Sequence, residues 1–139
     1  MLRLPERAYL EMIGLALDGY PLEVCGLLAG EGERADRFYP CRNVAESAKV
    51  YEIDPLDHLR ADRDAAAHGL ELMGVMHSHT HTDAFPSPTD IDRAPDPSWH
   101  YVIVSLREAE PVLRSYRITD AGKVEEPVVV ERRAGTIVD

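Results

Sequence analysis

The chain has 139 residues, 45% of them apolar and 29% charged, which is the balance of a globular protein with one core. Its net charge of −10 argues against nucleic acid and anionic membrane surfaces as partners, because both are bound by clustered Lys and Arg. No apolar run reaches the roughly 18 residues of a membrane span, and the charged N-terminus is unlike a signal peptide, so we expect one domain over residues 1–139 in the cytoplasm.

Hydrophobic periodicity and turn residues predict a mixture of helices and strands. In chain order we expect a helix over 5–19, strands over 24–29, 36–41 and 50–53, a helix starting at Asp54-Pro55 that carries Leu56, Leu59 and Ala66-Ala67, and strands over 70–76, 101–106, 112–118 and 124–130. This order predicts a mixed α/β (α+β) fold with a central mixed sheet flanked by helices. Residues 131–139 are expected either to fray or to pair with a partner chain, as in a homodimer.

The two cysteines, Cys25 and Cys41, are too few for a disulfide framework, which fits a reducing cytoplasm. Cys25 lies in the apolar run 24–28. We therefore predict a buried, inert thiol at this position.

The most informative stretch of the chain is His77-Ser78-His79, followed by Ser87 and Asp90. Side chains at i and i+2 of a strand point to the same face, so a strand running into this stretch aims both imidazoles at one point and turns Ser78 away. The two imidazoles and the Asp90 carboxylate make three metal ligands. A fourth tetrahedral position stays open, as in catalytic zinc sites.

Two other interpretations of the histidines stay open. Three of the six His fall within residues 77–81, as they would in a polar loop that is His-rich by chance. The segment from His79 to Asp83 also matches part of the HxHxDH signature of metallo-β-lactamase-type hydrolases. The final His of that signature is missing, because Ala84 stands in its place.

Ser87 and Asp90 also fit a structural role. Ser87-Pro88-Thr89-Asp90 has the pattern of a helix capping box, with Ser as N-cap, Pro as first helical residue and an acid at the third. The two roles are compatible, since a helix that starts at Ser87 would hold the Asp90 carboxylate at a fixed position beside a metal.

Hydrolysis at a metal centre also needs a general base that is not itself a ligand. Glu23, at the start of the predicted strand 24–29, is a candidate. From local sequence alone, a solvated glutamate at a strand edge is the default interpretation.

Together these residues resemble the JAMM (MPN+) metalloprotease signature, an upstream Glu followed by H-x-H, seven residues and S-x-x-D. The chain supplies every element of it: Glu23, His77, His79, Ser87 and Asp90. The resemblance extends to P-x-E-x-C-G-L-L-A-G around Glu23 and to Asn43 and Tyr51.

From His77 to about Val130 the chain further resembles bacterial Mec-type peptidases, which act on ubiquitin-like sulfur carriers such as CysO. The similar segments are HSHT, PS-x-TD, HYV-x-VS, LRSYRI and EEPV. Thr80 stands where many deubiquitinating relatives have Pro, which favours the Mec-type subgroup. His81 matches no ligand position of the family, so we expect it either to contact a metal-ligating side chain without binding the metal itself or to be exposed to solvent.

The resemblance implies a cytidine-deaminase-like MPN/JAMM domain with one zinc ion per chain, held by His77, His79 and Asp90. It also implies that Glu23 takes the proton of the attacking water and hands it to the leaving amine. Ser87 is implied to donate a hydrogen bond to the developing oxyanion.

The implied substrate and partner is a ubiquitin-like sulfur-carrier protein, cut after its C-terminal Gly-Gly to release cysteine or another adduct, as in cysteine biosynthesis. The small residues of such a tail suit a narrow cleft, where the tail can lie as an added strand. Two rivals stay open: an isopeptidase that removes ubiquitin-like modifiers from protein lysines, and a non-catalytic MPN scaffold. The complete five-residue set argues against the scaffold.

Overall fold

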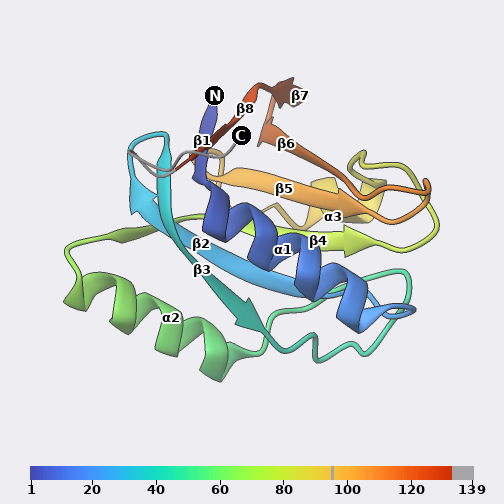
Figure 1. The fold of residues 1–139 in the computed structure, drawn as a ribbon, viewed down its shortest axis with the longest axis horizontal. Coiled ribbons are helices and arrows are strands. Elements are labelled where there is room, and N and C mark those ends of the chain that lie inside the picture. The colour runs from blue at the N-terminus through green and yellow to red at the C-terminus, as the bar shows by residue number, and fades with distance from the viewer. Residues whose placement is uncertain (95, 133–139) are drawn as a thin grey trace.

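The computed structural model describes residues 1–94 and 96–132, and these form one eight-stranded mixed sheet with helices on both faces (Figure 1). The elements are β1 (Leu2–Pro5), α1 (Glu6–Gly19), β2 (Cys25–Glu31), β3 (Arg34–Cys41), α2 (Pro55–Ala67), β4 (Glu71–His79), α3 (Pro88–Asp92), β5 (His100–Ser105), β6 (Val112–Thr119), β7 (Gly122–Glu126) and β8 (Val128–Glu131). The strand order is β7-β6-β5-β4-β2-β3-β1-β8, with β4 near the centre between β5 and β2. The predicted fold class is confirmed.

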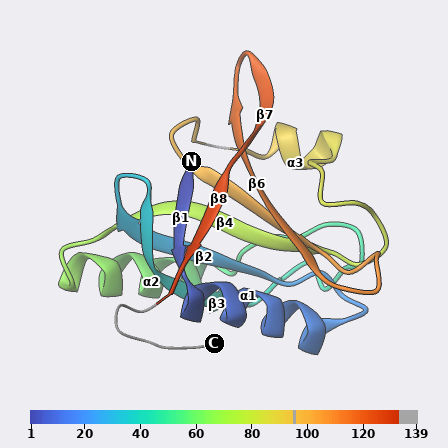
Figure 2. The ribbon, with the colours of Figure 1, turned by 45° about the horizontal axis from the view of Figure 1, so that its top comes forward.

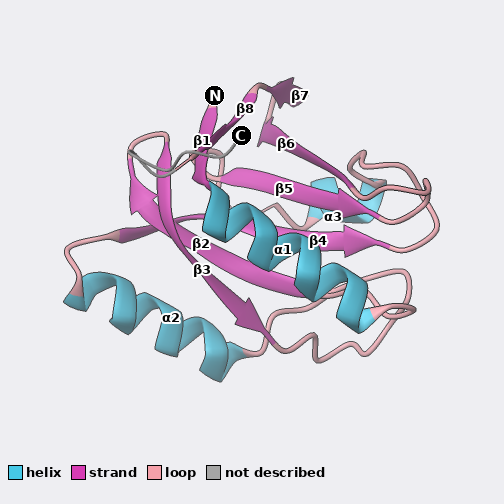
Figure 3. Ribbon diagram, in the orientation of Figure 1, coloured by secondary structure: helices cyan, strands magenta, loops and turns pink. Residues whose placement is uncertain are grey.

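The two faces of the sheet bury separate apolar clusters. Met12 of α1 packs in one cluster with Met76 of β4, whereas Ala61 of α2 packs in the other with Val75. Because side chains alternate along a strand, the even-numbered residues of β4 from Gly74 to His79 face α1 and the odd-numbered ones face α2 and α3. An irregularity in the β2–β4 register reverses this order earlier in β4, where Met73 packs on the α1 side and Leu72 on the other. Figure 3 shows α1 lying across the near face of the sheet, with α3 behind β4 and β5.

The ends of the chain differ from prediction. No strand was predicted before the helix, but Leu2–Pro5 form β1, which runs parallel to β3 and β8. The predicted strand over 124–130 is wrong as a single element, because Pro127 divides it into β7, which pairs with β6, and β8, which pairs with β1 (Figure 2). Proline has no N–H to donate to a ladder, and its carbonyl here accepts the N–H of Leu2. Of the predicted tail 131–139, Glu131 is the last residue of β8 and pairs with Pro5 of β1, and residues 133–139 lie outside the described residues.

The predicted strand over 50–53 is also wrong. It is a loop with one isolated bridge, between Ile53 and Asn43. The Asn43 side chain takes over the hydrogen bonds that a neighbouring strand would make, donating to the Val50 carbonyl at 3.1 Å and accepting from the Glu52 N–H at 2.9 Å.

The second helix begins as predicted, but with a different buried face. Asp54 is its N-cap, accepting a hydrogen bond from the Leu56 N–H at 2.8 Å, and Pro55 is its first residue. Leu56 and Leu59 are exposed, however, and the small residues Ala61 and Ala65 face the sheet. None of the helices within residues 1–94 and 96–132 has the length and hydropathy needed to cross a bilayer.

A buried carboxylate ties β7 to β5 and β6. Glu126 accepts hydrogen bonds from His100 and Ser115, each at 2.7 Å. Burial alone would raise the pKa of Glu126, but these bonds outweigh it and lower the pKa from 4.5 to about 2. A carboxylate whose pKa is lower in the folded than in the unfolded protein stabilises the fold at pH values above its unfolded-state pKa. That stabilisation is lost as the pH falls through its folded-state pKa.

We therefore expect Glu126→Gln to lower the free energy of unfolding at pH 7 by about 1.5–3 kcal/mol, the range for hydrogen bonds to a charged group. The deficit should shrink as pH falls from 4.5 to about 2, because the wild-type carboxyl is then protonated too. Urea unfolding at both ends of this range measures the difference. A deficit that does not change with pH would contradict the pairing.

Candidate metal centre and active site

β4 brings His77 and His79 to one point on the face of the sheet that α2 and α3 cover. Both rings are buried, with 3% and 4% of the residue surface exposed. Their Nε2 atoms lie 3.0 Å apart, and Oδ2 of Asp90 lies 3.2 Å from the first and 3.1 Å from the second. Three donor atoms from two elements therefore converge, all within 4.8 Å of one another.

The first turn of α3 fixes Asp90. The Ser87 hydroxyl accepts a hydrogen bond from the Asp90 N–H at 3.0 Å, and the Asp90 carboxylate accepts one from the Ser87 N–H at 2.9 Å. This is the predicted capping box. The same Oδ2 atom that completes the cap also faces both imidazoles, so one carboxylate serves the helix and the cluster. The Ser87 hydroxyl acts as acceptor in the cap, which leaves its proton free to be donated elsewhere.

Contacts behind the imidazoles set their orientation. Nδ1 of His79 donates a hydrogen bond to the Asp83 carbonyl at 2.7 Å. Because a carbonyl can only accept, Nδ1 carries a proton, which leaves Nε2 as the ring nitrogen that a metal ion could bind in place of a proton. The ring of Tyr51 stacks on His77, with the centroids 4.4 Å apart and an angle of 16° between the planes.

The donor chemistry of the cluster fits a divalent cation. Burial alone would raise the pKa of Asp90, but its hydrogen bonds with His77 and His79 hold that pKa well below the usual range, so the carboxylate is ionised. Burial lowers the pKa of His77, which favours the neutral imidazole that a metal requires. Two imidazole nitrogens and one carboxylate oxygen can hold zinc with a position left open.

Glu23 lies on the same side of the sheet as the cluster. Cys25 pairs with His77 in antiparallel β2 and β4, so Glu23, two residues earlier, comes beside His79 and points to the same face. The default interpretation of a solvated side chain is wrong, since only 5% of Glu23 is exposed. Within the described residues its Oε1 atom has no hydrogen-bond partner.

The pKa of Glu23 lies near neutrality. Burial raises it from 4.5 to about 7, with the charge of His79 acting to lower it and that of Asp90 to raise it. A carboxyl group with such a pKa can both take and give up a proton at neutral pH, as a general base and acid must. Glu23 and the three donor atoms together form a candidate hydrolytic site.

The backbone around Glu23 is fastened from three directions. The Val24 N–H donates to the Ser78 hydroxyl at 2.8 Å, the Asn43 side chain donates to the Glu23 carbonyl at 3.0 Å, and the Glu23 N–H donates to the Ser47 carbonyl at 2.8 Å. Spacing alone indicated none of these contacts. The only signal in the sequence was the resemblance, which included Asn43 and Tyr51 without assigning them a role.

The partial match to the HxHxDH signature has no counterpart in the described structure. His81 is exposed, with Nδ1 2.8 Å from the Thr80 hydroxyl and Nε2 3.3 Å from that of Tyr20. The Asp83 carboxylate pairs with Arg107 at 3.0 Å, and only the Asp83 backbone reaches the cluster.

Both cysteines are free, and Cys25 is buried as predicted. Burial raises the pKa of each thiol to about 12. They are therefore protonated and poor nucleophiles at neutral pH.

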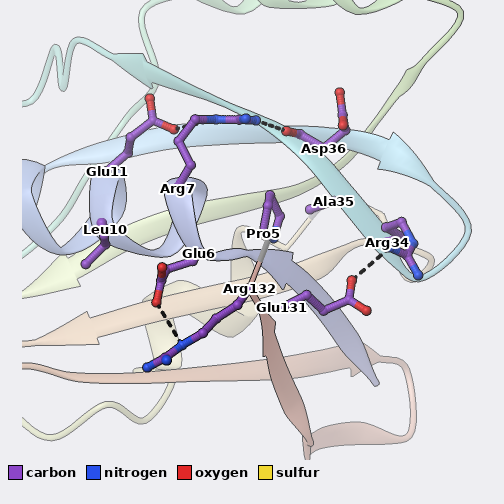
Figure 4. A pocket seen from close by; sticks show the side chains of 10 residues that line it. All are labelled: Pro5, Glu6, Arg7, Leu10, Glu11, Arg34, Ala35, Asp36, Glu131 and Arg132. Carbon is purple, nitrogen blue, oxygen red and sulfur yellow. Dashed lines mark hydrogen bonds and ion pairs between the residues drawn. The ribbon is translucent and has the colours of Figure 1, made fainter. Parts of the chain in front are cut away.

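Two hollows differ in their relation to this cluster. A hollow of about 380 Å³ adjoins it through Tyr51 and is lined mainly by apolar and aromatic side chains: Leu27, Tyr51, Ile53, His58, Val75 and Trp99. A wider hollow of about 950 Å³ lies between α1, β3 and the end of β8 (Figure 4). Ion pairs cross it, Arg34 with Glu131 at 2.9 Å and Arg132 with Glu6 at 3.4 Å, and none of the five candidate residues lines it.

Known proteins resemble this chain over nearly its whole length. Residues 5–119 match the family described as prokaryotic homologs of the JAB domain. The CysO-cysteine peptidase of Mycobacterium tuberculosis is 42% identical over 125 residues, which cover 87% of this chain and 86% of that protein. The desampylase of Haloferax volcanii is 38% identical over 88 residues, covering 61% of this chain and 63% of that protein.

A solved structure shares the fold closely. The solution structure of protein DSY2949 from Desulfitobacterium hafniense superposes with a TM-score of 0.87 at 35% sequence identity. The superposition covers 97% of this chain and 96% of that one.

Proposed function

The chain belongs to the prokaryotic homologs of the JAB domain, and from this membership we propose that it is a zinc-dependent metallopeptidase that cleaves after the C-terminal Gly-Gly of a ubiquitin-like sulfur-carrier protein. The cut releases cysteine or another adduct. One observation carries the proposal: a buried carboxyl with a pKa of about 7, Glu23, faces three convergent metal-donor atoms.

His77, His79 and Asp90 would hold one zinc ion per chain. Zinc bound there supplies Lewis-acid chemistry, polarising the scissile carbonyl and acidifying water. The orientation of His79 supports the assignment, because its Nδ1 proton is committed to Asp83 and its Nε2 is free to ligate.

Glu23 and Ser87 carry the proton and the charge. Glu23 takes a proton from the attacking water and later hands it to the leaving amine, which its near-neutral pKa allows. The Ser87 hydroxyl donates to the oxygen that gains negative charge as the carbonyl becomes tetrahedral. The amine leaves with the proton held by Glu23, and the carrier ends in a free carboxylate.

Ser87→Ala tests the oxyanion role. Loss of one donor to an oxyanion lowers kcat by about 10²- to 10³-fold. The same change removes the side-chain half of the cap, which costs about 1 kcal/mol of stability. We expect a folded, zinc-loaded protein with crippled turnover, measured by steady-state kinetics and thermal unfolding. A variant that keeps the wild-type kcat would refute the donor role.

The substrate class is supported by the relatives and by the shape of the site. One relative is named for a CysO-cysteine adduct and another is a desampylase. The hollow beside Tyr51 offers an apolar surface next to the cluster, which suits an extended tail with small final residues. A deconjugating isopeptidase would use the same residues on a lysine ε-amine.

Two matched substrates distinguish these functions. Both carry the same carrier tail ending in Gly-Gly, one joined to the α-amine of cysteine and the other to the ε-amine of lysine. We expect the zinc-loaded protein to cleave the first faster, with the products identified by mass spectrometry. Faster cleavage of the lysine conjugate would support the isopeptidase. No cleavage of either by a zinc-loaded protein would support a scaffold.

A further inference from the structure

Side chains from β5 and β6 anchor the loop that orients His79. The Tyr116 hydroxyl donates to the Ala84 carbonyl at 2.6 Å, and the Ser105 hydroxyl donates to the Thr82 carbonyl at 2.6 Å. These two carbonyls flank that of Asp83, which accepts the Nδ1 proton of His79. The loop is therefore held on both sides of the carbonyl that accepts the Nδ1 proton of His79.

Tyr116 also holds the loop beyond this hydrogen bond. Its ring meets that of Phe85 edge to face, with the centroids 5.9 Å apart. The Phe85 N–H in turn donates to the Asp83 carbonyl at 2.8 Å. Tyr116 thus contacts both residues that follow Asp83, and it does so from a strand in which it is 97% buried, with 3% exposed.

We infer that Tyr116 is a positioning residue for the metal centre, acting on His79 through the 82–85 loop. The inference rests on the proposed zinc site. The Tyr116 hydroxyl does not contact the cluster; it fixes the Ala84 carbonyl, and hence the Asp83 carbonyl, at the position where His79 must present Nε2 to the ion. Groups that hydrogen-bond directly to a metal ligand typically change metal affinity by about 10- to 100-fold when they are removed, and Tyr116 acts one contact farther out, so we expect a smaller change.

Tyr116→Phe tests the inference, because it removes the hydroxyl and keeps the ring and its contact with Phe85. The chain contains a matched control in Tyr101, which pairs directly with Tyr116 across β5 and β6 and is equally buried. Its hydroxyl donates to the Asp96 carbonyl at 2.7 Å and accepts from the Asp96 N–H at 3.1 Å, and within the described residues none of these atoms hydrogen-bonds to His79. Tyr101→Phe therefore deletes a buried hydroxyl with two hydrogen bonds, one more than Tyr116→Phe deletes, and leaves the hydrogen bonds of the 82–85 loop intact.

The measurement is zinc affinity, determined by competition with a chelator, alongside thermal unfolding of the metal-free proteins. We expect Tyr116→Phe to bind zinc more weakly than wild type, by up to about 10-fold, and Tyr101→Phe to bind it normally. The loss of thermal stability should be at least as large in Tyr101→Phe, which removes two hydrogen bonds. Ser105→Ala, which removes the other anchor, should weaken zinc binding in the same direction.

Three outcomes would each contradict the positioning role of Tyr116. Wild-type affinity in Tyr116→Phe would overturn the inference and leave the proposed function standing. Equal weakening in Tyr116→Phe and Tyr101→Phe would also overturn it, since the effect would then be general destabilisation. A wild-type protein that binds no zinc at all would overturn the inference and the proposed function together.

Discussion

Glu23→Ala is expected to bind zinc as tightly as the wild type and to hydrolyse no Gly-Gly-linked substrate. Glu23 is not among the three convergent donors, so its loss leaves the ligands intact. It is the buried carboxyl whose pKa of about 7 suits proton transfer, and general acid–base catalysis contributes about 10²- to 10⁴-fold to the rate. Zinc content and kcat, measured on the same preparation, check both halves of the expectation.

Glu23→Gln and Glu31→Gln make the comparison sharper. Glu23→Gln keeps the shape of the side chain and removes its ability to take a proton, so we expect it to be as inactive as Glu23→Ala. Glu31 lies at the exposed far end of β2, and Glu31→Gln should leave kcat unchanged. An active Glu23→Gln protein would refute the base assignment, because an amide cannot replace a carboxylate in that role.

Asp90→Ala and His77→Ala are expected to lose the metal and, with it, all activity. Each change removes one of three protein donors, and the remaining two make a poor zinc site. A ligand that binds only the folded state stabilises it by about 4 kcal/mol when present at 1,000 times its Kd. Added zinc should therefore raise the Tm of the wild type strongly and that of the two variants little.

Asp90 also caps α3, so its loss costs about 1 kcal/mol even without metal. His77→Ala leaves the cap intact and separates the two contributions. Asp92→Ala, at the exposed end of the same helix, is the matched control and should respond to zinc like the wild type. Full zinc occupancy in both Asp90→Ala and His77→Ala, measured by elemental analysis, would show that the ligand set is wrong.

The local parts of the site could be predicted from the sequence because their geometry depends on short spacings. Two histidines separated by one residue share a face on any strand, and Ser87 and Asp90 can cap a helix whatever surrounds it. The structure has both features. The predicted start of the second helix at Asp54 was correct for the same reason.

Features that depend on distant segments could not be predicted in this way. β1 was missed because its partners, β3 and β8, supply the hydrogen bonds that make it a strand. The loop around Tyr51 has strand-like residues, yet the side chain of Asn43 satisfies its backbone. The apolar residues Leu56 and Leu59 marked the second helix in the sequence, but in the structure both are exposed, and Ala61 and Ala65 are the residues buried against the sheet.

The sequence by itself determined the donor types, their spacing and the rigid mount of Asp90, since these follow from strand alternation and helix capping. Only the tertiary structure decided that Glu23 is buried and that its pKa is raised. A glutamate at a strand start is ordinarily solvated, and this one is buried because β4 and the 43–53 loop enclose it. Burial of a carboxyl raises its pKa through loss of solvation, and that loss depends on neighbours that are remote in the chain.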